Sequence, residues 1–211
     1  MSAIGDLTPV PREFQSALTE LRQAKCRSEI RLDEIPAPSR LAPFAVALGA
    51  EVFPASPPRM PVHGPAMAAF DGAEPEELAT GRFILLHDPN GSELWDGTFR
   101  IVTYIRAQLE PEMGNDSLLG SVAWTWLVES LQNHGAEHGS AGGTATRILS
   151  ESYGTLTDRP DSIDIELRAS WTPGSSMVRN HLEAWAEMVC TFAGLPPLPE
   201  GVASLPNRRR N

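Results

Sequence analysis

The stretch that decides the fold of this chain is IRAQLEP at residues 105–111, because it returns as LRASWTP at residues 167–173. The two copies begin 62 residues apart, and so do Gly81 and Gly143, which precede them. The alternation of apolar and polar side chains in each copy is typical of a strand with one buried face. The repeat therefore indicates that one supersecondary unit is used twice.

The repeated unit is predicted to be ββα, over residues 81–135 and residues 143–194. Each copy closes on a helical stretch that ends at a glycine, and a tryptophan lies nine residues before that glycine, Trp126 in the first unit and Trp185 in the second. Because 62 is an even number, equivalent residues point to the same face of a strand, whose side chains alternate with a period of two. Equivalent residues, the two tryptophans included, are expected to occupy matching places in the core.

Helical and strand periodicity predict the elements along the chain. They are a helix at 11–24, strands at 44–52, 82–88 and 98–109, a helix at 118–134, strands at 144–153 and 162–171, and a helix at 178–192. Strands with one apolar and one polar face need helices on one side only. The predicted fold is α+β: a single domain with an antiparallel sheet, helices on one face and the order α-β-β-β-α-β-β-α.

Three connections are predicted from turn and loop chemistry. Two prolines indicate an extended connector over residues 33–38, and Pro-Asn-Gly at residues 89–91 indicates a turn. The glycine-rich residues 139–144 are expected to form a flexible connection. They lack the lysine and the following helix of a phosphate-binding loop.

Composition divides the chain into one domain, one insertion and two ends. Residues 11–202 are expected to form the domain, between a flexible N-terminus at 1–10 and a disordered basic tail at 203–211. Residues 54–77 hold six prolines and an acidic run, and are expected to form an insertion loop between two strands. The length of this loop fits either a functional segment or tolerated slack.

Composition and charge also restrict the function. The chain has 211 residues, is 41% hydrophobic and carries a formal net charge of −10. That charge argues against a broad nucleic-acid surface, since affinity for the phosphate backbone comes mainly from clustered Lys and Arg. The sequence has no signal peptide and no apolar run of membrane-spanning length, so no membrane segment and a cytoplasmic location are expected. Cys26 and Cys190 are expected to be buried and reduced.

Residues 134–138, His-Gly-Ala-Glu-His, spell the inverted zinc-protease pattern H-x-x-E-H. Zinc binding would require both histidines on one face of a continuing helix. Gly135 is instead expected to end the helix, so His134 and His138 are not expected to converge. We predict no metal site, and no cofactor.

The outward face of the two long repeated strands is the first candidate site. It carries Arg100, Tyr104, Arg106, Asp164, Glu166 and Arg168. If the strands are neighbours, opposite charges form cross-strand ion pairs on a solvated face. The alternative is a recognition surface for a protein partner or for the 54–77 insertion.

A second candidate site surrounds the first hairpin. It contains His87, Asp88, Trp95 and Asp96, next to Arg100. Aspartate, histidine and arginine at the rim of a loop are the side chains of an acid–base site. The structural alternative is that Asp88 accepts backbone hydrogen bonds in a turn and Trp95 covers the end of the core.

Several stretches of the chain, which together span about residues 12–202 apart from the insertion, resemble an actinobacterial family known as domain of unknown function 3000. They are residues 34–43, 79–83, 86–89, 95–100, 109–113, 168–173 and 194–197. The resemblance implies a cytoplasmic actinobacterial protein, often encoded beside a ribonuclease D-like exonuclease, and implies no activity. The predicted element order also resembles that of type III secretion chaperones and YbjN-like domains, which are small, acidic, usually dimeric and non-catalytic.

These observations lead to one leading hypothesis and two alternatives. The leading hypothesis is a non-catalytic protein-binding or chaperone-like module, expected to be a homodimer, that engages an unidentified protein through its sheet or a helix groove. The first alternative is a small hydrolase or nucleotide-processing enzyme that uses His87, Asp88 and Asp96. The second alternative is an accessory factor in RNA processing, and it rests on the gene neighbourhood that the resemblance implies.

Overall fold

The computed structural model describes residues 9–54, 77–110, 114 and 116–195. In chain order the elements are α1 (Arg12–Gln23), β1 (Ile30–Ile35), β2 (Phe44–Val52), β3 (Ala79–Ser92), β4 (Gly97–Leu109), α3 (Leu119–Asn133), β5 (His138–Ser150), the 3-10 turn η1 (Gly154–Leu156), β6 (Ser162–Pro173) and α4 (Arg179–Phe192). The predictions for the N-terminus, the body of the 54–77 insertion and the 203–211 tail fall on residues outside this description.

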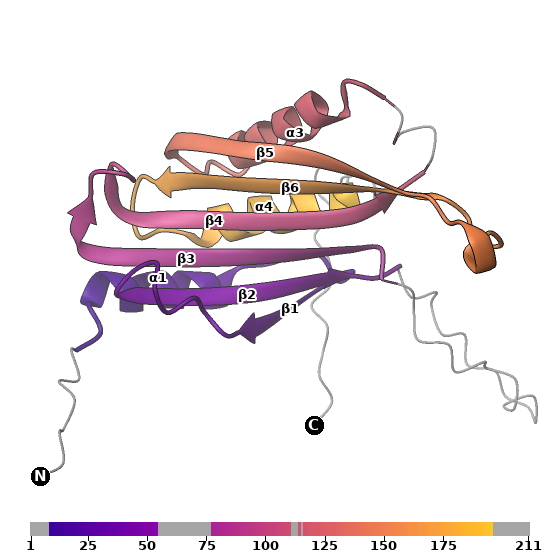
Figure 1. Ribbon diagram of the computed structural model, residues 1–211. Helices are drawn as coiled ribbons and strands as arrows, with labels where there is room; N and C mark the ends of the chain where they lie inside the picture. Colours follow the sequence, from indigo (N-terminus) through magenta and orange to yellow (C-terminus); the bar gives the residue numbers. More distant parts are fainter. Residues whose placement is uncertain (1–8, 55–76, 111–113, 115, 196–211) are drawn as a thin grey trace, which may run out of the picture.

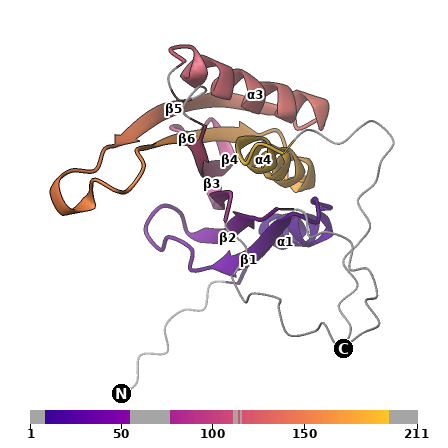
Figure 2. The same cartoon turned by 90° about the vertical axis from the view of Figure 1, so that its right-hand side faces the viewer.

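The strands form a single antiparallel sheet in the order β1-β2-β3-β4-β6-β5. Helices α1, α3 and α4 lie on one side of this sheet, and the view along the strands shows no α-helix on its other side (Figure 2). This confirms the predicted α+β class with helices on one face. We call the uncovered side the helix-free face.

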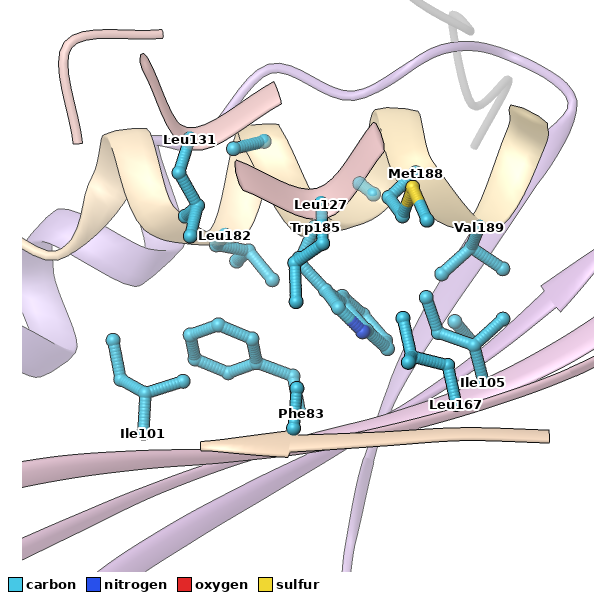
Figure 3. Close-up of a cluster of buried hydrophobic side chains, with 14 of the residues drawn as sticks. Phe83, Ile101, Ile105, Leu127, Leu131, Leu167, Leu182, Trp185, Met188 and Val189 are labelled. Atoms are coloured by element: carbon cyan, nitrogen blue, oxygen red, sulfur yellow. The ribbon is translucent and has the colours of Figure 1, made fainter. Parts of the chain in front are cut away.

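The core lies between the sheet and α4. On β4 the odd-numbered residues are buried and the even-numbered residues are more exposed, as the two-residue period of a strand requires. Trp185 points from α4 toward the strands (Figure 3), and its ring centroid is 5.6 Å from that of Phe83. Ile105 and Leu167 pack beside it from two neighbouring strands (Figure 3). Burial of these large apolar surfaces is the main force that holds helix and sheet together.

The two repeated strands β4 and β6 are neighbours, and β3 and β5 flank them on either side. The helices exchange partners, because α3 packs on β5 and α4 packs on β3. Two glycines allow this close packing. A Cβ atom on Gly81 would lie 2.6 Å from Cζ2 of Trp185, and a Cβ atom on Gly143 would lie 2.9 Å from Cζ3 of Trp124. Trp124, and not the predicted Trp126, is therefore the tryptophan that packs on the equivalent glycine as Trp185 does. Trp126 is half-buried and contacts Phe192.

Three sequence predictions about connections need correction. The predicted connector at 33–38 contains the end of β1, an edge strand that pairs with β2 and makes the element order α-β-β-β-β-α-β-β-α. The predicted turn at 89–91 lies inside β3, where the register with β4 shifts between His87 and Ser92, and the chain reverses at residues 93–96. The glycine-rich stretch 139–144 belongs to β5 because the backbone of β6 pairs with it.

Both later helices end as predicted, at Gly135 and Gly194. Each glycine has a positive φ, 61° and 75° respectively, in the left-handed region that glycine adopts without steric cost. The amide of the following residue then donates to a carbonyl five residues earlier, from Ala136 to Leu131 and from Leu195 to Cys190. This is the hydrogen bond of a Schellman motif.

Strand β5 forms one edge of the sheet. Nearly all of its thirteen residues are exposed, although α3 covers part of its inner side. From Gly139 to Thr146 it carries no charged side chain. Among the described residues, no further strand pairs with its outer edge.

Candidate functional site

All six residues of the first candidate site lie on the helix-free face, on the central strands β4 and β6. In Figure 1 these strands stand in front of α4, so the view is onto this face. Cross-strand partners form rows that run across the strands. The row through Tyr104 contains Arg82 on β3 and Arg168 on β6.

Tyr104 and Arg168 are held together by Glu166. The Tyr104 hydroxyl donates to Oε1 of Glu166 at 2.8 Å, and Nη2 of Arg168 donates to Oε2 of the same carboxylate at 2.7 Å. The Arg168 guanidinium carbon lies 5.6 Å from the centroid of the Tyr104 ring, within cation–π distance. Burial, followed by the hydrogen bond to Glu166, raises the pKa of Tyr104. Tyr104, Glu166 and Arg168 therefore hold one another in fixed positions on this face.

Arg106 makes the second ion pair of the face. Its Nη2 lies 3.0 Å from Oδ2 of Asp164, and this bond, with the charge of the aspartate, raises the pKa of Arg106. The side chain of Arg106 is 47% exposed, so the pair contributes about 0–1 kcal/mol to stability. The predicted cross-strand ion pairing is thus present between β4 and β6.

Arg100 binds neutral groups instead of a carboxylate. Its Nη1 donates to the carbonyl of Ser140 at 2.9 Å and to the hydroxyl of Thr172 at 3.1 Å, and its Nη2 donates to the hydroxyl of Ser170 at 2.7 Å. Burial lowers the pKa of Arg100. The side chain is a fixed cation without a negative partner among the described residues.

Sequence reasoning missed Arg82, which lies on β3 directly opposite Tyr104. The side chain is exposed and makes no hydrogen bond or ion pair with any other described residue. The even residues of β4 were already predicted to point outward, and Arg82 pairs with one of them, so it points outward too. This could be inferred only by knowing the register in which β3 and β4 pair.

An open depression of ≈ 740 Å³ lies along the centre of the helix-free face. Ile84 and Val102, which are cross-strand partners, form its apolar floor, and Arg82, Tyr104 and Arg168 border it. A second depression of ≈ 400 Å³ begins on the other side of Arg82 and Tyr104. The face can therefore hold an apolar group and an anion side by side.

The second candidate site is not assembled as an acid–base centre. His87 is fully buried on the helix side of the sheet, with its ring centroid 4.3 Å from that of Phe99, and its Nδ1 lies 3.1 Å from the carbonyl of Thr98. Asp88 accepts a hydrogen bond from the amide of Asn90 at 3.0 Å, as its structural alternative required, but both residues lie within β3 and not in a turn.

The other two members of that site lie in the turn between β3 and β4. Asp96 lies in the turn with a positive φ of 54°, and the carbonyl of Trp95 accepts a hydrogen bond from Thr172. His87 points to the core, Asp88 lies within β3 and Asp96 lies in the turn that follows β3, so the three side chains do not converge on one reactive point.

The H-x-x-E-H residues are split between two elements. His134 is the residue after the last turn of α3, and its Nδ1 lies 2.9 Å from the carbonyl of Ser130. His138 opens β5, and its Nδ1 lies 2.8 Å from the carbonyl of Ala136. Within the described ranges, no group of three His, Cys, Asp or Glu side chains is placed to hold a metal ion.

Comparison with known protein families shows which family the chain belongs to. A family model described as protein of unknown function (DUF3000) matches residues 10–203. The chain belongs to this family. No curated protein and no solved structure was found to match the chain. In the part of the chain that is described, no helix is long and apolar enough to cross a membrane.

Proposed function

We propose that this protein is a cytoplasmic, non-catalytic binding module that engages an acidic segment of a protein partner through its helix-free face. The observation that carries the proposal is the pair of arginines, Arg82 and Arg100, that face this side without a carboxylate partner among the described residues. They stand on a chain whose formal net charge is −10. A guanidinium presents donors in a planar fork that matches a carboxylate.

The ion pairs of the face support an orienting role for their members. Arg106 and Arg168 are each bonded to an acid of β6, so most of their charge is already balanced inside the molecule. Arg168 is also held against Tyr104. A partner would therefore gain most from Arg82, whose donors are free of described partners, while Tyr104 and Arg168 provide a fixed border.

The chemistry of the face favours a protein over a nucleic acid. Ile84 and Val102 form an apolar floor, which suits an aliphatic or aromatic side chain. Asp164 and Glu166 lie within the same patch and would repel a continuous phosphate backbone. A protein segment can alternate carboxylates with apolar side chains and so avoid these acids.

The test uses a charge reversal that breaks no internal contact. Arg82→Glu is expected to lower recovery of the specific partner from native lysate by tenfold or more, because a charged hydrogen bond is replaced by repulsion. Arg159→Glu, at an exposed position between β5 and β6, makes the same change of charge at a residue that does not line the depression, and should leave recovery unchanged. Equal recovery by wild type and Arg82→Glu, with both proteins folded, would refute the proposal.

A further inference from the structure

The helix-free face carries a regular pattern along β4. Arg100, Val102 and Tyr104 are alternate residues of this strand, so all three point to the same side. Each belongs to a cross-strand row: Leu86 lies opposite Arg100, and Ile84 lies opposite Val102. Two rows with guanidiniums thus enclose one apolar row.

The spacing of these rows follows from strand geometry. Successive rows are two residues apart along a strand, which is about 6.6–6.8 Å. The row of Arg100 and the row of Arg82, Tyr104 and Arg168 are therefore separated by about 13 Å. An extended peptide that runs parallel or antiparallel to β4 has the same repeat, because its side chains i, i+2 and i+4 also point to one side.

We propose that the helix-free face recognises an extended segment of a partner protein with an acidic, an apolar and an acidic residue at positions i, i+2 and i+4. This inference rests on the proposed function and names the segment that the face would bind. The apolar side chain would lie on Ile84 and Val102. One carboxylate would meet Arg82 on β3, and the other would meet Arg100, whose side chain extends over β6 to Ser170 and Thr172. Arg82, Ile84 and Val102 line the depression of ≈ 740 Å³, and Arg100 lies outside its lining.

The donors needed for this recognition are available. Arg82 uses none of its five donors on another described residue. Arg100 has three hydrogen bonds, to Ser140, Thr172 and Ser170, which leaves part of its fork for a carboxylate and fixes its orientation. Because Arg100 is pre-oriented, it loses little side-chain freedom on binding and favours an acid at a defined position over a diffuse acidic surface.

The experiment compares two labelled peptides of identical composition by fluorescence anisotropy on the full chain. One is Ser-Glu-Ser-Leu-Ser-Glu-Ser, with the proposed spacing, and the other is Ser-Ser-Glu-Glu-Leu-Ser-Ser. We expect the first to bind about tenfold tighter, the ratio for one charged contact made or lost. Arg82→Ala and Val102→Ser should each remove this preference, whereas Arg159→Ala should retain it.

Each other outcome decides against the inference. Equal affinity for both peptides would show recognition of charge alone, which overturns the spacing and leaves the proposed function intact. Absence of peptide binding, with a lysate partner that still depends on Arg82, has the same meaning. Binding that requires deletion of residues 55–74 would assign the face to the insertion of this chain, and tighter binding of an RNA heptamer than of either peptide would assign it to nucleic acid.

Discussion

Ile105 and Leu167 lie directly opposite each other on β4 and β6, although they are the equivalent residues of two stretches 62 positions apart. A local two-fold axis passes between any two residues that are paired in this way in an antiparallel sheet. Here the strand order β3-β4-β6-β5 and the exchanged packing of α3 and α4 are symmetric about the same point. Equivalence of the complete units 81–135 and 143–194 remains a prediction, which superposition of their backbones will test.

The contact between Gly81 and Trp185 predicts a large effect from one methyl group. In Gly81→Ala the added Cβ would lie 2.6 Å from the indole and 3.1 Å from the carbonyl of Tyr104, so side chain and backbone must both move. We expect a loss of about 1–3 kcal/mol in the free energy of unfolding, measured in urea. Gly142→Ala, where a Cβ meets nothing within 4 Å, is the matched control and should change it by less than about 0.5 kcal/mol.

His181 predicts a loss of stability in mild acid. Burial, followed by the charge of His138, lowers the pKa of His181 from 6.5 to about 4. Between these values the unfolded chain binds a proton that the folded chain excludes, so stability is complete above pH 6.5 and falls as the pH drops toward 4. The difference amounts to about 3 kcal/mol.

The check for this effect is a variant that cannot titrate. Trp171 donates its indole N–H to Nδ1 of His181 at 3.0 Å, and Gln at position 181 retains an acceptor for it. Urea unfolding at pH 7 and at pH 4.5 should show a smaller acid-dependent loss in His181→Gln than in wild type. The same loss in both proteins would assign the acid sensitivity to other groups.

The two cysteines predict slow thiol chemistry in the native state. Burial, followed by the charge of nearby glutamates such as Glu183, raises the pKa of Cys26 to about 12, and burial raises that of Cys190 to about 12 as well. Cys190 is buried as expected, whereas Cys26 is only partly buried. Since the thiolate is the nucleophile, reaction with a disulfide reagent at pH 8 should be slow when the protein is folded and rapid in guanidinium. Rapid modification of native protein at one cysteine, identified with Cys26→Ser and Cys190→Ser, would contradict this expectation.

Tyr104 and Arg106, which are each bonded to an acid on the helix-free face, are expected to contribute differently to the free energy of unfolding. Tyr104→Phe removes a donor from the buried carboxylate of Glu166 and should cost about 1–2 kcal/mol of unfolding free energy. Arg106→Ala removes a partner from an ion pair whose arginine is 47% exposed, and should cost about 0–1 kcal/mol. Urea denaturation of both variants at low and high salt will test the order, because only the second effect should fade with salt.

The strands that bury one face were predictable because burial imposes a period of two on their sequence. The predicted ranges 98–109 and 162–171 agree closely with β4 and β6. β1 was missed because an edge strand with exposed Arg31 and Asp33 takes its structure from the backbone of β2 and not from an apolar pattern. For β5, small residues were interpreted as a loop, whereas part of their role is to let Trp124 of α3 approach the sheet.

The candidate site was partly predictable for the same reason. Parity placed the six polar residues of β4 and β6 on one face. Ion pairs between the two strands were expected without named partners, and the structure has one between Arg106 and Asp164. The position of Arg82 beside Tyr104 depends on the register between β3 and β4, and the apolar floor depends on that register too. Neither follows from the pattern within a single strand.

The uncharged edge of β5 has a consequence for handling the protein. A long exposed edge of small residues offers unpaired amides and carbonyls to any other strand, and folded proteins usually block such edges with charges or prolines. Molecules of net charge −10 repel one another, and we expect this repulsion to oppose such pairing. Concentrated samples should consequently precipitate or form fibres near the isoelectric point of ≈ 4.9, and a single lysine at Ala141 should preserve their clarity there.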